Sequence, residues 1–445
     1  MADEPHGPAG GRSRSRRSTA LRLAGSAGVI AAVLAVAGVA VAVHLAGRGS
    51  SGPGSGPGPS GGSAPTGAAV PDDWQPVGLP AGFSADGISC VSTADCLVIG
   101  WGAAGEPSAT AIWRYSGGAW TSVPIAGVGS GALEGLTCVT ADDCWAVGQH
   151  QTVPPSDSDG VTKPLIEHDT GSGFAPVSGP VVPGDADGLG SITCAGADDC
   201  WAAGTYAANS ENGGDGILHP LLEHYDGSGW TVATLAGPLI DYGGLGAVSC
   251  FGPDECWASA GTPDGGVVEE FDGSSWSVVS APLLAPSPGF SQSGVGRVAC
   301  TSPTDCWAVG STGYPTVPNQ LTQPLIAHYD GTGWTPVSSP SVSGPNGAVL
   351  SGIACVSSDD CWAVGSTQAA FQALPAFIGP TPTPSPDPAL FSQPVIEHYT
   401  DGAWELVATP QSGTENTGLG DITCLPSSDD CYAAGQSALW ILTGA

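Results

Sequence analysis

Short apolar segments separated by polar turns recur along this chain from about residue 72 to its end. Seven times, an apolar residue stands two positions before a cysteine, a gap of five or six residues ends in an acid, and a second cysteine opens another apolar segment. The clearest copies of that second segment are 306–310 and 361–365, which both read CWAVG. A repeat of about 50 residues built from strand-like pieces predicts a stacked or radial array of small sheets.

Each repeat contains four strand-like pieces. The third is an apolar run such as 324–329 (PLIAHY), and a turn rich in Asp and Gly separates it from a fourth piece that begins with an aromatic residue. Such short strands with turn residues between them predict a small antiparallel sheet. Both faces of the sheet are apolar, because in CWAVG the Trp and Val point to one side and the Ala to the other. Neighbouring repeats must therefore cover both faces, and a ring does so without an uncovered end.

The two ends of the repeat array are complementary. Trp74 occupies the position of a fourth-strand aromatic residue but has no strands of its own repeat before it, whereas the last repeat stops after a third strand at 438–442. The N-terminal strand is therefore expected to complete the last sheet. The predicted fold is all-β, a seven-bladed β-propeller whose N-terminal strand closes the last blade. The fourth-strand aromatic residues are Trp74, Trp120, Phe174, Trp230, Trp276, Trp334 and Trp404.

Two segments, 225–230 (YDGSGW) and 329–334 (YDGTGW), resemble the repeats of kelch and galactose-oxidase-type propellers, and the resemblance extends over about residues 72–445. The sequence departs from that pattern in having a single Gly where kelch repeats have two, and in its cysteine pairs. The Asp-Gly-x-x-Trp piece also resembles a shortened sialidase Asp-box. These resemblances imply the fold and carry little about function, because propellers host many functions.

All 14 cysteines lie in the seven repeats, and each pair flanks the turn of a predicted hairpin. Local pairing is the simplest connectivity, and it would staple each blade. The expected disulfides are Cys90–Cys96, Cys138–Cys144, Cys194–Cys200, Cys250–Cys256, Cys300–Cys306, Cys355–Cys361 and Cys424–Cys431. Metal binding by paired thiolates is the alternative, but zinc sites favour cysteines separated by about two to four residues.

Two further residue types recur with the cysteines. The acid before each second cysteine is expected to stabilise the turn by bonding to its own backbone, with calcium binding as the alternative. A histidine recurs in the third strand, which lies far from the ring axis, so its copies cannot converge on one ligand and are expected to make a repeated structural hydrogen bond. The tryptophans after the second cysteines are expected to pack between blades. The acids are Asp95, Asp143, Asp199, Glu255, Asp305, Asp360 and Asp430, and the histidines are His168, His224, His328 and His398.

The N-terminal part has a different character. Residues 24–43 carry no charged side chain, and a helix of about 20 residues spans a bilayer of about 30 Å. Five arginines precede this segment and favour a cytoplasmic N-terminus. The expected organisation is a cytoplasmic tail (1–23), a transmembrane signal-anchor helix (24–46), a Gly/Ser/Pro linker (47–70) and the propeller (71–445), in a single-pass protein of the cell membrane with the propeller outside the cytoplasm. A cleaved signal peptide, with its cleavage site at the small residues 40–42, is the alternative.

The exported part is strongly acidic. After Arg48 the chain has three basic residues against 39 acidic ones, a net charge of −36. Such a surface repels nucleic acid and anionic lipid headgroups, so no nucleic-acid partner is expected.

The loops that join strands two and three vary in length and composition, at 149–163, 205–219, 311–323 and 366–393, whereas the loops on the opposite face are short and repetitive. In propellers the variable loops share one face with the connections between blades. Variation on one face of a regular scaffold indicates recognition. The candidate ligand-binding residues there are Tyr206, Tyr242, Tyr314, Phe371, Asp185 and Asp241, and the expected ligand is a cell-surface protein or a cell-wall glycan.

No catalytic residue, cofactor or metal is expected. A sialidase-like site needs three arginines, and the exported part has only Arg114 and Arg297. A galactose-oxidase-like copper site needs Tyr, His and Cys together, and the cysteines belong to the blades. The sequence has no nucleophile elbow and no phosphate loop. The alternative is a glycan hydrolase or lyase: carboxylates converging in the central funnel would favour it, and a funnel lined by Gly, Ser and Ala would favour binding. A purely structural envelope protein is a third possibility.

Overall fold

The computed structural model describes residues 74–103, 106–127, 131–152, 161–182, 187–207, 218–236, 244–262, 265–279, 294–312, 322–340, 347–367, 392–409, 416–425 and 427–443. The predicted tail, membrane helix and linker therefore lie outside the described residues. No helix within these ranges is long and apolar enough to cross a bilayer.

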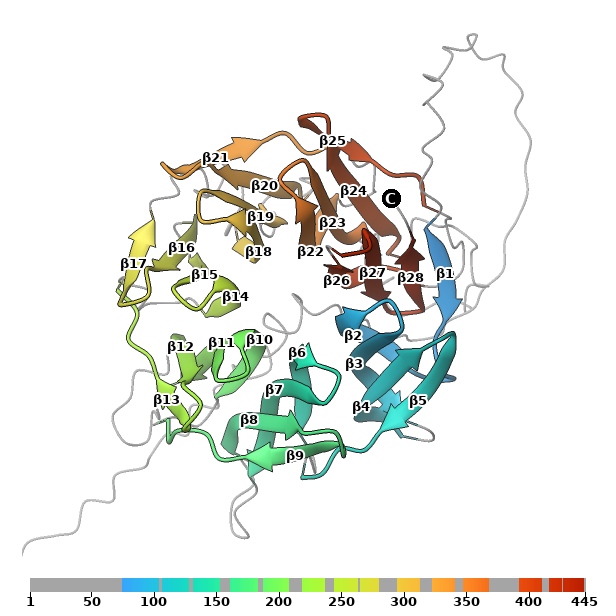
Figure 1. The fold of residues 1–445 in the computed structure, drawn as a ribbon, viewed down its shortest axis with the longest axis vertical. Helices are drawn as coiled ribbons and strands as arrows, with labels where there is room; N and C mark the ends of the chain where they lie inside the picture. Colours follow the sequence, from blue (N-terminus) through green and yellow to red (C-terminus); the bar gives the residue numbers. More distant parts are fainter. Residues whose placement is uncertain are drawn as a thin grey trace, which may run out of the picture. The chain divides into compact units, whose positions relative to one another are not determined.

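The described residues form seven four-stranded antiparallel sheets arranged as a ring, which confirms the predicted seven-bladed β-propeller (Figure 1). In each of the first six blades the strands follow in chain order from the ring axis outward. Blade 1 contains β2 (Ser84–Ser92), β3 (Asp95–Ala103), β4 (Glu106–Ser116) and β5 (Ala119–Val123). Blade 2 contains β6 (Ala132–Thr140), β7 (Asp143–Thr152), β8 (Val161–Asp169) and β9 (Phe174–Val177). Blade 3 contains β10 (Gly188–Gly196), β11 (Asp199–Ala207), β12 (Leu218–Tyr225) and β13 (Trp230–Val232).

The other half of the ring repeats this plan. Blade 4 contains β14 (Leu245–Gly252), β15 (Glu255–Thr262), β16 (Gly265–Phe271) and β17 (Trp276–Val279). Blade 5 contains β18 (Gly294–Ser302), β19 (Asp305–Ser311), β20 (Pro324–Tyr329) and β21 (Trp334–Val337). Blade 6 contains β22 (Ala348–Ser357), β23 (Asp360–Thr367), β24 (Pro394–Thr400) and β25 (Ala403–Leu406). Blade 7 contains β26 (Leu419–Leu425), β27 (Asp430–Gly435), β28 (Ala438–Leu442) and, as its outermost strand, β1 (Gln75–Gly78).

The ring closes through its first strand, as the complementary ends predict. β1 pairs antiparallel with β28, with Gln75 opposite Ile441 and Gly78 opposite Ala438. Trp74, just before β1, is buried in the same core cluster as Trp440. The blade that the C-terminal segment leaves incomplete is thus finished by residues more than 300 positions earlier.

The hydrophobic core is divided into seven clusters, one at each seam between neighbouring blades. At the seam of blades 2 and 3, Trp145 and Val147 of β7 pack against Cys200 and Ala202 of β11. Alternate residues of each second strand therefore face opposite neighbours, which is the two-sided burial that the CWAVG pattern predicts. An apolar ring of this kind buries both faces of every sheet without an exposed end.

Seven disulfides connect the first two strands of the seven blades, and their pairing is the one expected from the sequence. Each lies beside the hairpin between strands one and two. We call this end of a blade its lower end, and the end with the loops between strands two and three its upper end.

Candidate functional site

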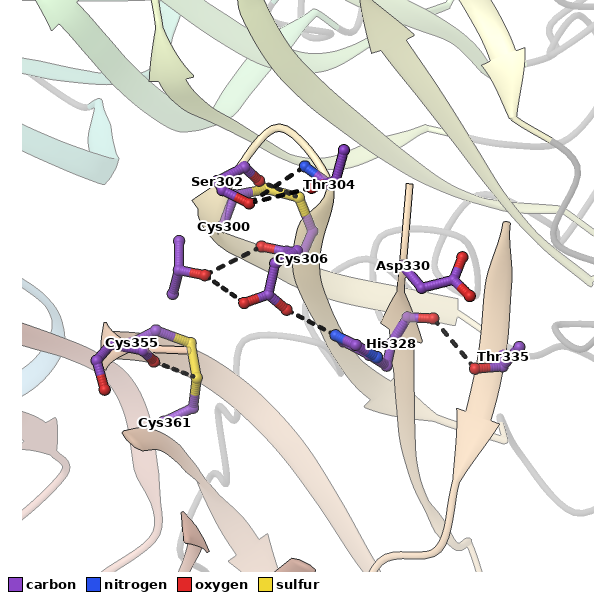
Figure 2. Close-up of polar contacts among 12 residues, drawn as sticks. Cys300, Ser302, Thr304, Cys306, His328, Asp330, Thr335, Cys355 and Cys361 are labelled. Carbon is purple, nitrogen blue, oxygen red and sulfur yellow. Dashed lines mark hydrogen bonds and ion pairs between the residues drawn. A yellow bond between two sulfur atoms is a disulfide. The ribbon is translucent and has the colours of Figure 1, made fainter. Parts of the chain in front are cut away.

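The repeated acids and histidines meet at the lower ends of the blades. In four blades the histidine Nε2 of the third strand donates a hydrogen bond to the acid before the second cysteine. The pairs are His168–Asp143 (2.7 Å), His224–Asp199 (2.8 Å), His328–Asp305 (2.6 Å) and His398–Asp360 (2.8 Å). Figure 2 shows the contact of His328, close to the Cys300–Cys306 disulfide. The prediction of a repeated structural hydrogen bond is confirmed.

The sequence predicted a bond from the acid to its own backbone, whereas the structure gives it a side-chain partner. That partner lies on the neighbouring strand, because the antiparallel register places the third-strand histidine opposite the tryptophan that follows the second cysteine. Each histidine ring also stacks on that tryptophan, as His168 does on Trp145 with ring centroids 3.8 Å apart. In blade 1, Arg114 takes the place of the histidine and bonds to Asp95 at 3.0 Å. A site that recurs with interchangeable partners stabilises the blades rather than holding a ligand.

The innermost strand of every blade has a β-bulge at the same position. The residues left out of the pairing register are Asp86, Glu134, Gly190, Gly246, Gly296, Ser351 and Gly420. Bulges locally bend a strand and increase its twist. Glycine is required where the strands come closest: a Cβ on Gly420 would lie 2.7 Å from the carbonyl oxygen of Asp86 in the next blade.

A cavity of about 140 Å³ lies among these strands, and its lining includes Glu134, Arg297 and Asp421. The Arg297 side chain extends across it from blade 5. Its guanidinium donates to Ser191 Oγ of blade 3 at 3.0 Å, and its Nε lies 3.9 Å from Asp421 Oδ1 of blade 7. Asp421 in turn accepts a hydrogen bond from the backbone N–H of Ile88 in blade 1. One arginine therefore connects alternate blades across the centre of the ring.

The central carboxylates are perturbed by burial, and the charge of Glu134 also raises the pKa of Asp86. Burial raises the pKa of Asp86 to about 6, against a hydrogen bond from Trp101 that lowers it. Burial also raises the pKa of Glu134, which accepts a hydrogen bond from Gln149 at 3.1 Å. Burial raises the pKa of Asp421, although the charge of Arg297 opposes the shift. Each of the three carboxylates thus has its own partner from the protein, and the described residues contain no group of three potential metal ligands.

The predicted binding residues lie mostly outside the described part of the chain. This applies to Tyr242, Tyr314, Phe371, Asp185 and Asp241. Tyr206 is described, and its placement corrects the prediction: it lies in β11 and not in a loop. The second and third strands of blades 2 and 3 extend further than the sequence indicated, to Thr152 and Ala207, because their upper ends continue to pair.

This extension brings Tyr206 opposite His219 of β12, and the two rings stack with centroids 5.0 Å apart and planes at 27°. In blade 2 the corresponding pair is His150 opposite Lys163. Lys163 Nζ lies 2.9 Å from Asp187 Oδ2, just before β10 of blade 3. We call these five residues, His150, Lys163, Asp187, Tyr206 and His219, the blade 2–3 rim.

Four members of the rim were missed by sequence reasoning. A signal for one of them was present, since Lys163 is the chain's one lysine. The other three depend on strand register. The repeat pattern predicted the second strand only as far as the glycine of CWAVG, so it did not show which residues beyond that glycine are paired. The same positions in blades 5 and 6 carry Thr312 opposite Gln323 and Thr367 opposite Gln393.

Comparisons with known proteins support the fold. No protein-family model and no curated protein matches this sequence, so the kelch resemblance is not supported at the level of a sequence family. Among solved structures, the chain is similar to the RRP9 WD40 repeats, with a TM-score of 0.53 and 10% identity over 83% of this chain and 97% of that one. Similarity also extends to YCF48 bound to D1 peptide (TM-score 0.48, 12% identity, 84% of this chain and 97% of that one). A GH74 xyloglucanase from Xanthomonas campestris gives a TM-score of 0.49 at 13% identity, over 83% of this chain and 53% of that one. At 10% identity, the similarity to the RRP9 WD40 repeats supports the β-propeller fold and shows nothing about a ligand.

Proposed function

We propose that this chain is an extracytoplasmic binding module, held at the cell membrane by its N-terminal segment, that engages a cell-surface protein or a glycan on the upper face of its propeller. The observation that carries the proposal is the divergence of the blade 2–3 rim from the corresponding positions of blades 5 and 6. The lower ends of the blades reuse one set of bonds, whereas the upper ends of two adjacent blades carry ionisable and aromatic side chains where blades 5 and 6 have threonine and glutamine. Residues of this kind on a rigid scaffold are the usual components of a recognition site.

A pull-down tests this proposal. The full chain, immobilised in detergent, is exposed to cell-surface extract and to purified wall polysaccharide, beside a variant in which residues 153–160 and 368–391 are shortened. Retention of one species by the intact chain alone supports a binding module on the upper face. Equal retention by both forms, or retention of nothing, contradicts it.

Membrane attachment is a separate part of the proposal. It is supported by the uncharged segment 24–43 and the five arginines before it. An affinity tag placed before residue 1 should remain on the mature membrane-bound protein, and external protease should remove the propeller from intact cells. Loss of the tag from the mature chain would instead indicate cleavage near residues 40–42.

The alternative is a glycan hydrolase or lyase that uses the central carboxylates, and the raised pKa values of Asp86 and Glu134 favour it. Two observations weigh against it. The cavity of about 140 Å³ is smaller than the roughly 300–1,000 Å³ of typical ligand pockets. The carboxylates are also separately bonded, to Trp101 and Gln149, and not to each other. Turnover of a wall glycan that disappears in both Asp86→Asn and Glu134→Gln would establish the alternative.

A further inference from the structure

We propose that the blade 2–3 rim is a binding site for a neutral glycan, in which the Tyr206–His219 ring pair packs against a sugar ring and the ammonium of Lys163, held in place by Asp187, donates to its hydroxyl groups. This inference rests on the proposed binding function and specifies its site and its ligand class. It uses only residues on strands or directly beside them, at the upper ends of blades 2 and 3.

The rim is a continuous row across the seam. Gly188, the first residue of β10, pairs with Thr205, so Asp187 lies one register step above this pair, beside Tyr206. Tyr206 pairs with His219, and on the other side of the seam Asp187 meets Lys163 at 2.9 Å. The backbone N–H of Asp187 also donates to the carbonyl of Thr162 at 3.2 Å, which ties the two blades together at this point. The row is therefore positioned by backbone pairing and not by loop conformation.

The row is rigid but remains accessible. Asp187 has no exposed side-chain surface, whereas the Lys163 side chain is 32% exposed. Tyr206 and His219 are half-buried, and Tyr206 packs partly against the core cluster of the seam. Side chains that are anchored by such contacts lose little conformational entropy when a ligand binds.

The chemistry of these groups fits a polyhydroxylated ligand. The ammonium of Lys163 carries three N–H donors, and its partner Asp187 is fully buried beneath it. Sugar hydroxyls accept hydrogen bonds, so a hydroxyl can bond to this ammonium without separating the ion pair. The C–H groups on the face of a pyranose ring are apolar and pack against an aromatic ring, which supplies a large contact area and a polar tip. Pockets that combine aromatic walls with a few fixed polar groups are the general form of small-ligand sites.

Charge selects a neutral glycan over an acidic one. The exported part has a net charge of −36, and a surface of that charge repels anionic polymers. Lys163 does not offset this locally, because its charge is already balanced by Asp187. A uronic-acid or phosphate-bearing polysaccharide would therefore approach against the field of the whole domain.

A glycan also fits the rim better than a protein surface does. The centres of protein interfaces are depleted of charged residues and are built around apolar anchors. The described rim consists of one ion pair, two imidazoles and one phenol. Among the described residues of the connection between blades 2 and 3, Val181 is the large apolar residue that is strongly exposed, and a single exposed apolar residue is common on protein surfaces.

The test measures binding of the full chain, purified in a detergent without a sugar headgroup, to an array of neutral polysaccharides (glucans, mannans, galactans) and anionic ones. The variants are Tyr206→Ala, Tyr206→Phe and Lys163→Gln. The matched control is Thr312→Ala, the position in blade 5 that corresponds to Tyr206. Near-ultraviolet circular dichroism and the thermal midpoint verify that each variant keeps the wild-type fold.

The full chain is expected to bind at least one neutral polysaccharide, and Tyr206→Ala to weaken that binding about tenfold, which corresponds to about 1.4 kcal/mol. Tyr206→Phe should retain most of the affinity because the ring remains, Lys163→Gln should lower it severalfold, and Thr312→Ala should leave it within about twofold. Equal effects of Tyr206→Ala and Thr312→Ala, preference for anionic polymers, or no binding to any polysaccharide would overturn the inference. Capture of a surface protein with no polysaccharide bound would overturn it while the proposed binding function stands. Retention of nothing at all would contradict both.

Discussion

The lower and upper ends of the blades differ in what is repeated. At the lower end, the same disulfide and, in four blades, the same acid–histidine–tryptophan contact recur. At the upper end, two residues beyond the glycine of the second strand, blades 5 and 6 have threonines whose hydroxyls accept backbone hydrogen bonds from the facing strand, at 3.0 and 2.9 Å. Blades 2 and 3 have His150 and Tyr206 there instead.

This difference indicates which contacts a blade needs for its stability. Each blade has to cover its neighbours and close its hairpin, and the lower ends do both with the same repeated contacts. The threonines of blades 5 and 6 show that the upper end requires only a small side chain that satisfies a backbone group. The larger groups of the blade 2–3 rim exceed this requirement, which is the basis of the proposed recognition site. Changes at the lower end should lower the free energy of unfolding and leave ligand binding intact. Changes at the rim should weaken ligand binding and have a smaller effect on the free energy of unfolding.

The largest effect is expected for a core tryptophan at the lower end. Trp307 is 2% exposed and packs edge-on against Trp404, with ring centroids 5.3 Å apart. Trp307→Ala should lower the free energy of unfolding by about 4 kcal/mol through lost burial and a cavity. Trp307→Leu should cost clearly less, because blade 1 carries Leu97 in the corresponding place. Urea unfolding measures both variants, and equal costs for Ala and Leu would contradict the packing argument.

The next largest effect is expected for Glu223, in β12 of blade 3. Glu223 is fully buried, and neither of its carboxylate oxygens has a hydrogen-bond partner among the residues that the structure describes. Burial raises the pKa of Glu223 from 4.5 to about 8, and the charge of Asp187, which is itself paired with Lys163, adds to the shift. As the pH rises from 4.5 towards 8, the unfolded chain ionises this group while the folded chain does not. The stability that neutral Glu223 contributes is therefore fully present below pH 4.5 and is lost as the pH rises through about 8.

Between pH 5 and pH 8, at about 1.4 kcal/mol per pKa unit, the contribution of Glu223 to this loss is roughly 4 kcal/mol at most. Glu223→Gln removes it, so this variant should lose less stability than the wild type when urea unfolding is compared at pH 5 and pH 8. Glu405→Gln, at an exposed position of β25, is the matched control and should follow the wild type. Identical pH dependence of Glu223→Gln and wild type would show that this carboxyl is not kept neutral by burial.

A smaller effect is expected for the loss of one disulfide. Replacing Cys300 and Cys306 together by alanine opens a short loop, whose closure is worth about 2 kcal/mol on the chain-entropy model. The double variant should unfold at a lower denaturant concentration and bind its ligand as the wild type does. If the double variant is fully folded and yet binds its ligand more weakly, the lower end contributes to recognition. The two ends would then not have separate roles.

The smallest effect on stability, and the most specific effect on binding, is expected from exchanging rims. Tyr206→Thr with His219→Gln gives blade 3 the residues of blade 5 at Thr312 and Gln323. The free energy of unfolding should fall by about 1 kcal/mol, because Tyr206 packs partly against the core cluster of the seam. Glycan binding should fall about tenfold or more. A large loss of stability without a specific loss of binding would show that Tyr206 is a packing residue of the seam.

Much of the fold could be predicted from the repeat, and less of the site. The cysteine spacing predicted all seven disulfides, and Trp74 without a preceding repeat predicted the closure by β1. Tyr206 was recognised as a candidate, but the loop boundaries placed it wrongly, because polar residues at strand ends do not show whether pairing continues. His219 became visible as its partner only when β11 and β12 were paired.

The sequence by itself determined the number of blades, the disulfide pairing and the two-sided burial, because each of these depends on residues that are close in the chain and recur in every repeat. The tertiary structure alone decided which residues meet across blades. Arg297 bonds to Ser191 and lies near Asp421 across the ring centre, over separations of more than 100 positions. Lys163 meets Asp187 across a seam. Such contacts depend on how far the strands extend and on where the ring closes. Those are properties of the assembled sheets, and a local pattern of apolar and polar residues does not contain them.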